Sequence, residues 1–210
     1  MEFKEGYVYH IKDSYFEKVN DDKLMRNKEN GNFRPTFYCL KDQKTSLLWV
    51  VPMSSRVEKY QAIVNKQTER YGESLGIYIG TFDGKPSAFL IQNMFPITDK
   101  YLDHIHTRNG NPVPVKESVK SEVKSRMQKA RRLVARGKNV VFPDILRLEK
   151  LMLDEISKCK SPQLTESVSR SVKKAPFSVS KLKAEAQRIH NQEKNSVSKE
   201  KSHKKDDHSL

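Results

Sequence analysis

Short segments in which apolar residues alternate with polar ones, or run together, fill much of residues 1–100. Such segments are typical of β-strands when polar or turn-forming residues bound them. The polar stretch KDQKT separates the apolar segment at 34–40 from the one at 46–53, so this pair predicts a β-hairpin. Asp83-Gly84 lies between the segments at 76–82 and 87–95, and this pair predicts a second hairpin. We expect an antiparallel or mixed sheet from five strands, at residues 6–12, 34–40, 46–53, 76–82 and 87–95.

Three other segments repeat their apolar residues at helical spacing. The first covers about residues 54–71 and begins with SRVE at 55–58, which has the form of a capping box. The second covers 116–136 and is followed by Gly137, a typical C-terminal cap. The third begins at Pro143-Asp144. This order predicts an α+β domain whose helices pack on one side of the sheet.

The composition changes sharply near Lys160. Residues 161–210 are rich in Ser and Lys and nearly without large apolar side chains, so we expect a disordered basic tail after a domain of residues 1–160. The 210 residues include 40 Lys and Arg against 26 Asp and Glu, a net charge of +14. Residues 157–210 hold 13 of the basic and 6 of the acidic residues, so each part contributes +7. This excess predicts a polyanionic partner.

Cysteine usage and hydropathy favour a cytoplasmic protein. Cys39 and Cys159 are too few and too far apart for a secreted disulfide framework. No window approaches the roughly 18 consecutive apolar residues of a transmembrane helix. The opening residues mix charges with aromatics where a signal peptide has an apolar stretch. We therefore expect neither export nor a membrane partner.

The segment from Met53 to Lys59 is the strongest candidate for chemistry. A strand is expected to end here and a helix to begin, and the first backbone N–H groups of a helix attract anions. Ser54 and Ser55 supply hydroxyls, Arg56 supplies a guanidinium, and Lys59 supplies an ammonium group one turn later. Together they suit an anion of phosphate size. The alternative is a plain helix cap, for which serine is a common residue.

Four motifs follow one another between residues 6 and 156. R-P at 34–35 opens one apolar strand, P-M-S-S at 52–55 closes the next, M-F-P-I lies at 94–97, and the long basic helix comes last. Their order and spacing resemble those of the ToxN and AbiQ family of endoribonuclease toxins from type III toxin-antitoxin systems. The resemblance implies a curved antiparallel sheet with helices around it.

The resemblance also implies an activity and a partner. It implies a bacterial RNase that acts in phage abortive infection, needs no metal or other cofactor, and is inhibited by a small antitoxin RNA of pseudoknot repeats that joins toxin subunits into an RNA-bridged oligomer. It places Arg34, Ser54 and Ser55 in the active site. Many members have S-P-K where this chain has Ser55-Arg56 and then Lys59, so either basic residue takes the role of the family lysine.

These five residues also suit RNA cleavage on physical grounds. The ribose 2′-OH of RNA can attack the adjacent phosphorus, so a protein need only align the attack, assist proton transfer and stabilise the phosphorane. Charge stabilisation suits Arg34 and Arg56, because a guanidinium, with a pKa above about 12, rarely acts as an acid. Ser54 and Ser55 would orient the phosphate, and Lys59 would protonate the leaving group. We expect 2′,3′-cyclic phosphate and 5′-OH ends.

Further residues are candidates for RNA binding. The predicted helix at 116–136 carries basic residues opposite its apolar stripe. Such a face is usually only solvated, but on this chain we favour contacts to an RNA backbone. Tyr38 and Tyr60 are candidates for base stacking. His104 and His106 would share one face of a strand, where they could bind a metal or act as acid and base, but we favour a loop that contacts RNA. The candidates on the basic helix are Lys124, Arg126, Lys129, Arg131, Arg132 and Arg136.

Two rival hypotheses use the same residues. A non-catalytic RNA- or DNA-binding regulator would use the basic helix at 116–138 and would leave RNA intact. A metal-dependent nuclease would use His104 and His106, and EDTA would abolish its activity.

Overall fold

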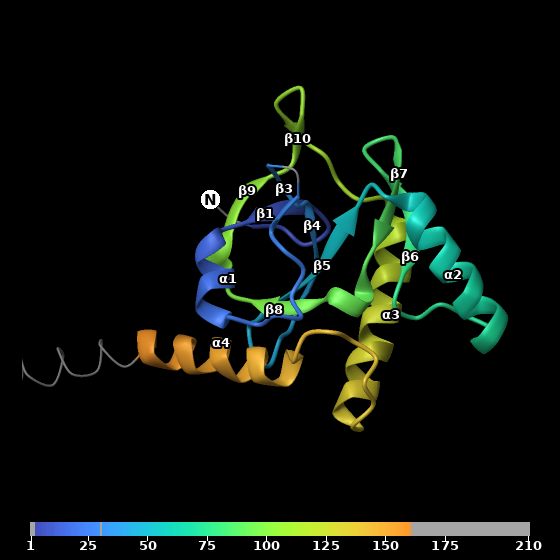
Figure 1. The fold of residues 1–210 in the computed structure, drawn as a ribbon. Coiled ribbons are helices and arrows are strands. Elements are labelled where there is room, and N and C mark those ends of the chain that lie inside the picture. Colours follow the sequence, from blue (N-terminus) through green and yellow to red (C-terminus); the bar gives the residue numbers. More distant parts are fainter. Residues whose placement is uncertain (1–2, 30, 161–210) are drawn as a thin grey trace, which may run out of the picture. The chain divides into compact units, whose positions relative to one another are not determined.

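The computed structural model of the chain describes residues 3–29 and 31–160. The predicted tail, residues 161–210, lies outside the described residues. The described part contains a seven-stranded antiparallel sheet, two small hairpins and four α-helices (Figure 1). The predicted α+β class is therefore confirmed.

The central strand of the sheet is β5 (Leu48–Ser54). One edge of β5 pairs with β4 (Thr36–Lys41). Its other edge pairs first with β8 (Phe95–Ile97) and then, at Met53 and Ser54, with β7 (Lys85–Phe89). β1 (Val8–Ile11) and β9 (Leu102–Ile105) extend the sheet beyond β4, and β6 (Tyr78–Phe82) extends it beyond β7. Both predicted hairpins, β4–β5 and β6–β7, are present.

Four α-helices accompany the sheet: α1 (Asp13–Val19), α2 (Val57–Tyr71), α3 (Glu117–Ala135) and α4 (Ile145–Lys160). The predicted helices at 116–136 and after Pro143 are confirmed as α3 and α4, whereas α1 was not predicted. The first predicted helix starts later than expected, because its first residue, Ser54, pairs with β7. Arg56 is the N-cap of α2 and has no side-chain capping bond, so the predicted capping box does not form.

The helices cover both faces of the sheet, and the prediction that they pack on one side was wrong. All seven residues of β5 are buried, and a strand that is apolar on both faces needs cover on both. The apolar stripe of α3 packs against one face, beside Phe37, Trp49 and Val51. α1 and α4 pack against the other face, beside Tyr38, Leu48 and Val50. α2 packs against β6 and β7.

Short elements complete the described chain. The predicted strand at 87–95 is interrupted by a 3-10 turn, η1 (Ile91–Asn93), because the chain must pass from the β7 pairing to the β8 pairing along the same edge of β5. The expected loop around His104 contains strand β9, which pairs with β1. The remaining pieces are β2 (Lys28–Glu29), β3 (Asn32–Phe33), η2 (Asp99–Tyr101), β10 (Thr107–Arg108) and β11 (Asn111–Pro112). None of the described helices is long and apolar enough to cross a membrane.

Candidate active site

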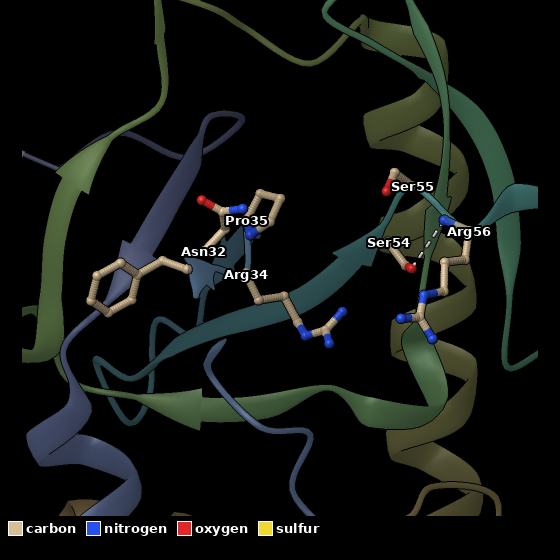
Figure 2. Close-up of a pocket in the computed structure, with 7 residues that line it drawn as sticks. Asn32, Arg34, Pro35, Ser54, Ser55 and Arg56 are labelled. Carbon is tan, nitrogen blue, oxygen red and sulfur yellow. Dashed lines mark hydrogen bonds between the residues drawn. The ribbon is translucent and has the colours of Figure 1, made fainter. Parts of the chain in front are cut away.

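A cavity of about 260 Å³ opens at the C-terminal end of β5 (Figure 2). One wall is the segment before β4, and the other is the junction between β5 and α2. Sheet pairing brings these walls together, and the Met53 N–H donates to the Pro35 carbonyl at 2.9 Å. The cavity is lined by Asn32, Phe33, Arg34, Pro35, Ser54, Ser55 and Arg56.

Arg34 is held by hydrogen bonds to the backbone of three residues. Its own N–H donates to the Asn27 carbonyl at 2.7 Å. Its side chain donates from Nε to the Arg26 carbonyl and from a terminal nitrogen to the Met53 carbonyl, both at 3.2 Å. In Figure 2 the guanidinium groups of Arg34 and Arg56 extend from opposite walls toward the same space. Two guanidinium groups in this arrangement favour an anion between them.

Ser54 and Ser55 are neighbours with different environments. Ser54 is only 6 % exposed, and its hydroxyl oxygen accepts the backbone N–H of Arg56 at 3.2 Å (Figure 2). Ser55 is exposed at the cavity wall. The buried hydroxyl therefore fixes the turn that presents Arg56, while the Ser55 hydroxyl is open to a ligand.

Lys59 lies beyond the first cavity. It lines a second hollow of about 450 Å³ together with Ser55, Arg56 and Pro86. Because Ser55 and Arg56 belong to both hollows, the two adjoin. Four of the five predicted catalytic residues thus lie around one cavity, and the fifth lies in the neighbouring hollow.

Three histidines form a cluster beside Phe33. The rings of His10 and His104 are stacked with their centres 4.4 Å apart, and His106 lies 6.5 Å from His10. Phe33, which lines the cavity, meets the His10 ring edge-on at 6.2 Å. Burial lowers the pKa of His10, the charges of His104 and His106 lower it further, and Asp103 acts in the opposite direction. Sequence reasoning missed His10, although it lies in the alternating pattern of the first predicted strand.

Acidic side chains lie near this cluster as well. Asp103 is 2.9 Å from the His104 ring, and Asp83 is 3.6 Å from the His106 ring. Among residues 3–29 and 31–160, no three or more His, Cys, Asp or Glu side chains are grouped so that they could hold a metal ion. The described geometry of the cluster is one of stacked rings with a carboxylate close to two of them.

Four of the predicted RNA-binding cations of α3 are paired with carboxylates of the same domain. Such pairs compensate the charge that an RNA backbone would otherwise attract. Arg132 and Arg136 are exposed near the end of the helix. The ion pairs join Lys124 to Glu5 at 2.9 Å, Arg126 to Glu122 at 2.7 Å, Lys129 to Glu73, and Arg131 to Asp42 at 2.9 Å.

The two predicted base-stacking tyrosines belong to the core. Tyr38 is 4 % exposed and packs beside Tyr9 and Leu48, and burial raises its pKa to about 12. Tyr60 is 9 % exposed and lies on the buried face of α2, in the cluster that contains Ile77, Ala88 and Leu90. Burial of both rings argues against stacking on RNA bases.

Comparison with known proteins identifies the fold. Neither a family model nor a curated protein sequence matches the chain. A ToxN structure from a bacterial antiviral system that a processed non-coding RNA regulates is 19 % identical, with a TM-score of 0.53 over 69 % of this chain and 95 % of that one. AbiQ, a lactococcal anti-phage endoribonuclease belonging to the type III toxin-antitoxin system, is 16 % identical, with a TM-score of 0.52 over 72 % of this chain and 98 % of that one. The chain therefore has the fold of the ToxN and AbiQ structures, as the order of its motifs predicted.

Proposed function

We propose that this chain is an endoribonuclease toxin of a type III toxin-antitoxin system that acts against phage. The observation that carries the proposal is the convergence of Arg34, Ser54, Ser55 and Arg56 around one cavity, on a fold shared with AbiQ. Two guanidinium groups and an exposed hydroxyl suit a phosphodiester better than a neutral ligand. We place this activity in residues 1–160 and expect it in the cytoplasm.

The proposed reaction is an internal transesterification of RNA. The ribose 2′-OH transfers its proton to a general base and attacks the adjacent phosphorus, and the bond from phosphorus to the 5′ oxygen breaks. The leaving 5′ oxygen takes up a proton, which gives a 2′,3′-cyclic phosphate and a 5′-OH. The phosphorus–oxygen bonds that form and break belong to RNA, so the protein contributes alignment, proton transfer and charge stabilisation.

Each residue has a role that follows from its place. Arg34 and Arg56 stabilise the negative charge of the phosphorane from opposite walls. Ser55 hydrogen-bonds to the phosphate, and Ser54 positions Arg56 through the turn. Lys59 protonates the leaving oxygen from the adjoining hollow, so Lys59→Arg slows cleavage of RNA while sparing a substrate whose nitrophenolate leaving group needs no proton.

The proposed regulator is a small antitoxin RNA built from pseudoknot repeats. Support comes from the structural neighbour whose system a processed non-coding RNA regulates. The antitoxin would occupy the cavity, exclude substrate RNA, and join several toxin subunits into an RNA-bridged oligomer.

Purified protein incubated with RNA and EDTA tests the proposal. We expect fragments with cyclic phosphate and 5′-OH ends, identified by mass spectrometry, and at least about a hundredfold slower cleavage by Ser54→Ala combined with Ser55→Ala. The matched control is Ser118→Ala combined with Ser121→Ala, because both of these serines are exposed on α3. Intact RNA with the wild-type protein would favour the regulator hypothesis, and cleavage abolished by EDTA would favour the metal-dependent nuclease.

A further inference from the structure

Three cations form a stripe on α2 that begins beside the proposed active site. Lys59, Lys66 and Arg70 are separated by seven and then four residues, so they lie within about 40° of one another around the helix. All three are exposed. Glu58 and Glu69 lie about a quarter turn away around the helix. The stripe therefore presents positive charge along one side of α2.

These cations differ from those of α3 in their partners. Lys124, Lys129 and Arg131 of α3 are paired with the carboxylates of Glu5, Glu73 and Asp42, which lie in loop segments. Within residues 3–29 and 31–160, Lys59, Lys66 and Arg70 form no ion pair with a carboxylate. Their charge is thus available to an external anion.

The far end of the stripe meets a groove of about 480 Å³ with exposed aromatic rings. Tyr71 is 66 % exposed and Phe142 is 54 % exposed, and both line the groove. The Arg70 guanidinium lies 5.1 Å from the centre of the Tyr71 ring. The amide side chains of Gln67 and Gln92 also line it, as does Glu73, whose carboxylate is paired with Lys129. Exposed rings beside amides and cations are the composition of surfaces that bind unpaired nucleobases.

The stripe connects this groove to the cavity. The second hollow, which Arg56 and Lys59 line, adjoins the cavity at one end of α2. Figure 1 shows α2 running from the end of β5 along β6, which it contacts. Fifteen helical residues span about 20 Å, so the groove at Tyr71 lies several nucleotides from the cavity.

We propose that the stripe and the groove bind the unpaired strand of substrate RNA that extends from the active site. The cations contact successive phosphates, and Tyr71 and Phe142 stack on bases at the far end. The inference rests on the proposed function for the identity of the ligand, whereas the surface itself rests on the α2 geometry. It moves the RNA-binding surface from α3, where sequence reasoning placed it, to α2.

Binding of a non-cleavable RNA to the full chain tests the proposal. The probe is an unpaired, fully 2′-O-methylated RNA of about 12 nucleotides, followed by fluorescence anisotropy over a range of salt concentrations. For Lys66→Gln combined with Arg70→Gln, we expect the slope of log K against log salt to shrink by about 1.4, since each lost phosphate contact on a single strand removes about 0.7. For Tyr71→Ala we expect at least about fivefold weaker binding, with a nearly unchanged slope.

The matched control is Lys150→Gln combined with Lys158→Gln, which removes the same charge from exposed positions on α4. The proposal would be overturned if Lys66→Gln combined with Arg70→Gln lost no more affinity, and no more of the slope of log K against log salt, than this control. Cleavage of a dinucleotide distinguishes failure of this proposal from failure of the proposed function. Lys66, Arg70 and Tyr71 lie outside the cavity, so variants at these positions should cut a dinucleotide at the wild-type rate. If the wild type binds along α2 and cuts no RNA, the surface stands and the nuclease proposal fails.

Discussion

Ser54 and Ser55 differ in burial, and this difference predicts different consequences for the same substitution. The buried Ser54 hydroxyl accepts the Arg56 N–H, so Ser54→Ala should lower the free energy of unfolding by about 1 kcal/mol as well as the rate of RNA cleavage. Ser55 is exposed, so Ser55→Ala should change stability by less than about 0.5 kcal/mol while still slowing cleavage. Urea unfolding and single-turnover kinetics measure the two effects. Equal losses of stability in both variants would contradict the assignment.

His10 gives the folded domain a dependence on pH. Burial is the main cause that lowers its pKa below the ordinary value of 6.5, so the unfolded chain binds this proton more readily than the folded chain. The stability from His10 is therefore complete above about pH 6.5 and is lost as the pH falls through the lower pKa of the folded state. His10→Phe keeps a stacking ring and removes the titration.

We predict that the melting temperature of the wild type falls more steeply than that of His10→Phe between about pH 7 and pH 5. The buried Nδ1 of His10 has no hydrogen-bond partner among the described residues, so phenylalanine sacrifices no bond at that atom. Differential scanning calorimetry at several pH values measures the difference. Parallel curves of melting temperature against pH for the two proteins would show that the pKa of His10 is the same in the folded and unfolded states.

At the scale of elements, Arg131 attaches α3 to the sheet. Its guanidinium lies 4.0 Å from the centre of the Trp49 ring and pairs with Asp42. A lysine cannot reproduce both the stacking and the directed hydrogen bonds, so Arg131→Lys should lower the free energy of unfolding by about 1–2 kcal/mol. The neighbouring exposed residue provides the control, since Arg132→Lys should change stability by less than about 0.5 kcal/mol.

RNA binding by the same variant separates structure from recognition. If Arg131 contributes mainly to packing, then Arg131→Lys at a temperature where it is folded should bind RNA with wild-type affinity. A large loss of affinity for RNA with unchanged stability would instead support α3 as an RNA-binding surface, as its basic face predicted.

Elements with local signals were predictable, and those set by distant pairing were not. The β6–β7 hairpin follows from Asp83 and Gly84, which both adopt positive φ as a tight hairpin turn requires. β9 depends on pairing with β1, more than ninety residues earlier in the chain, which no local pattern encodes. The same cause explains Ser54, which has the composition of a helix cap but is held in β5 by Ala88. The motifs of the cavity were predictable by resemblance, whereas the ion pairs that occupy α3 depend on the tertiary fold.

At the scale of the whole molecule, the net charge of +14 combines groups of cations that differ in whether carboxylates pair with them. Carboxylates of the same domain pair with four of the α3 cations, whereas Lys59, Lys66 and Arg70 of α2 form no ion pair with a carboxylate among the described residues. Residues 157–210 supply another 13 basic residues. Net charge alone therefore does not show which cations of the folded domain are paired with carboxylates and which could attract an external anion.

This division predicts what removal of residues 161–210 does. If catalysis belongs to residues 1–160, a chain ending at Lys160 should cut a dinucleotide at the wild-type rate. Its affinity for long RNA should fall at low salt, because it lacks many of the basic residues that attract phosphates, and the deficit should shrink as salt screens the attraction beyond about 8 Å near physiological ionic strength. A full-length variant with the lysines of 161–210 changed to glutamine should behave like the shortened chain, because the predicted contribution is charge. Loss of dinucleotide cleavage on shortening would instead place part of the active site in residues 161–210.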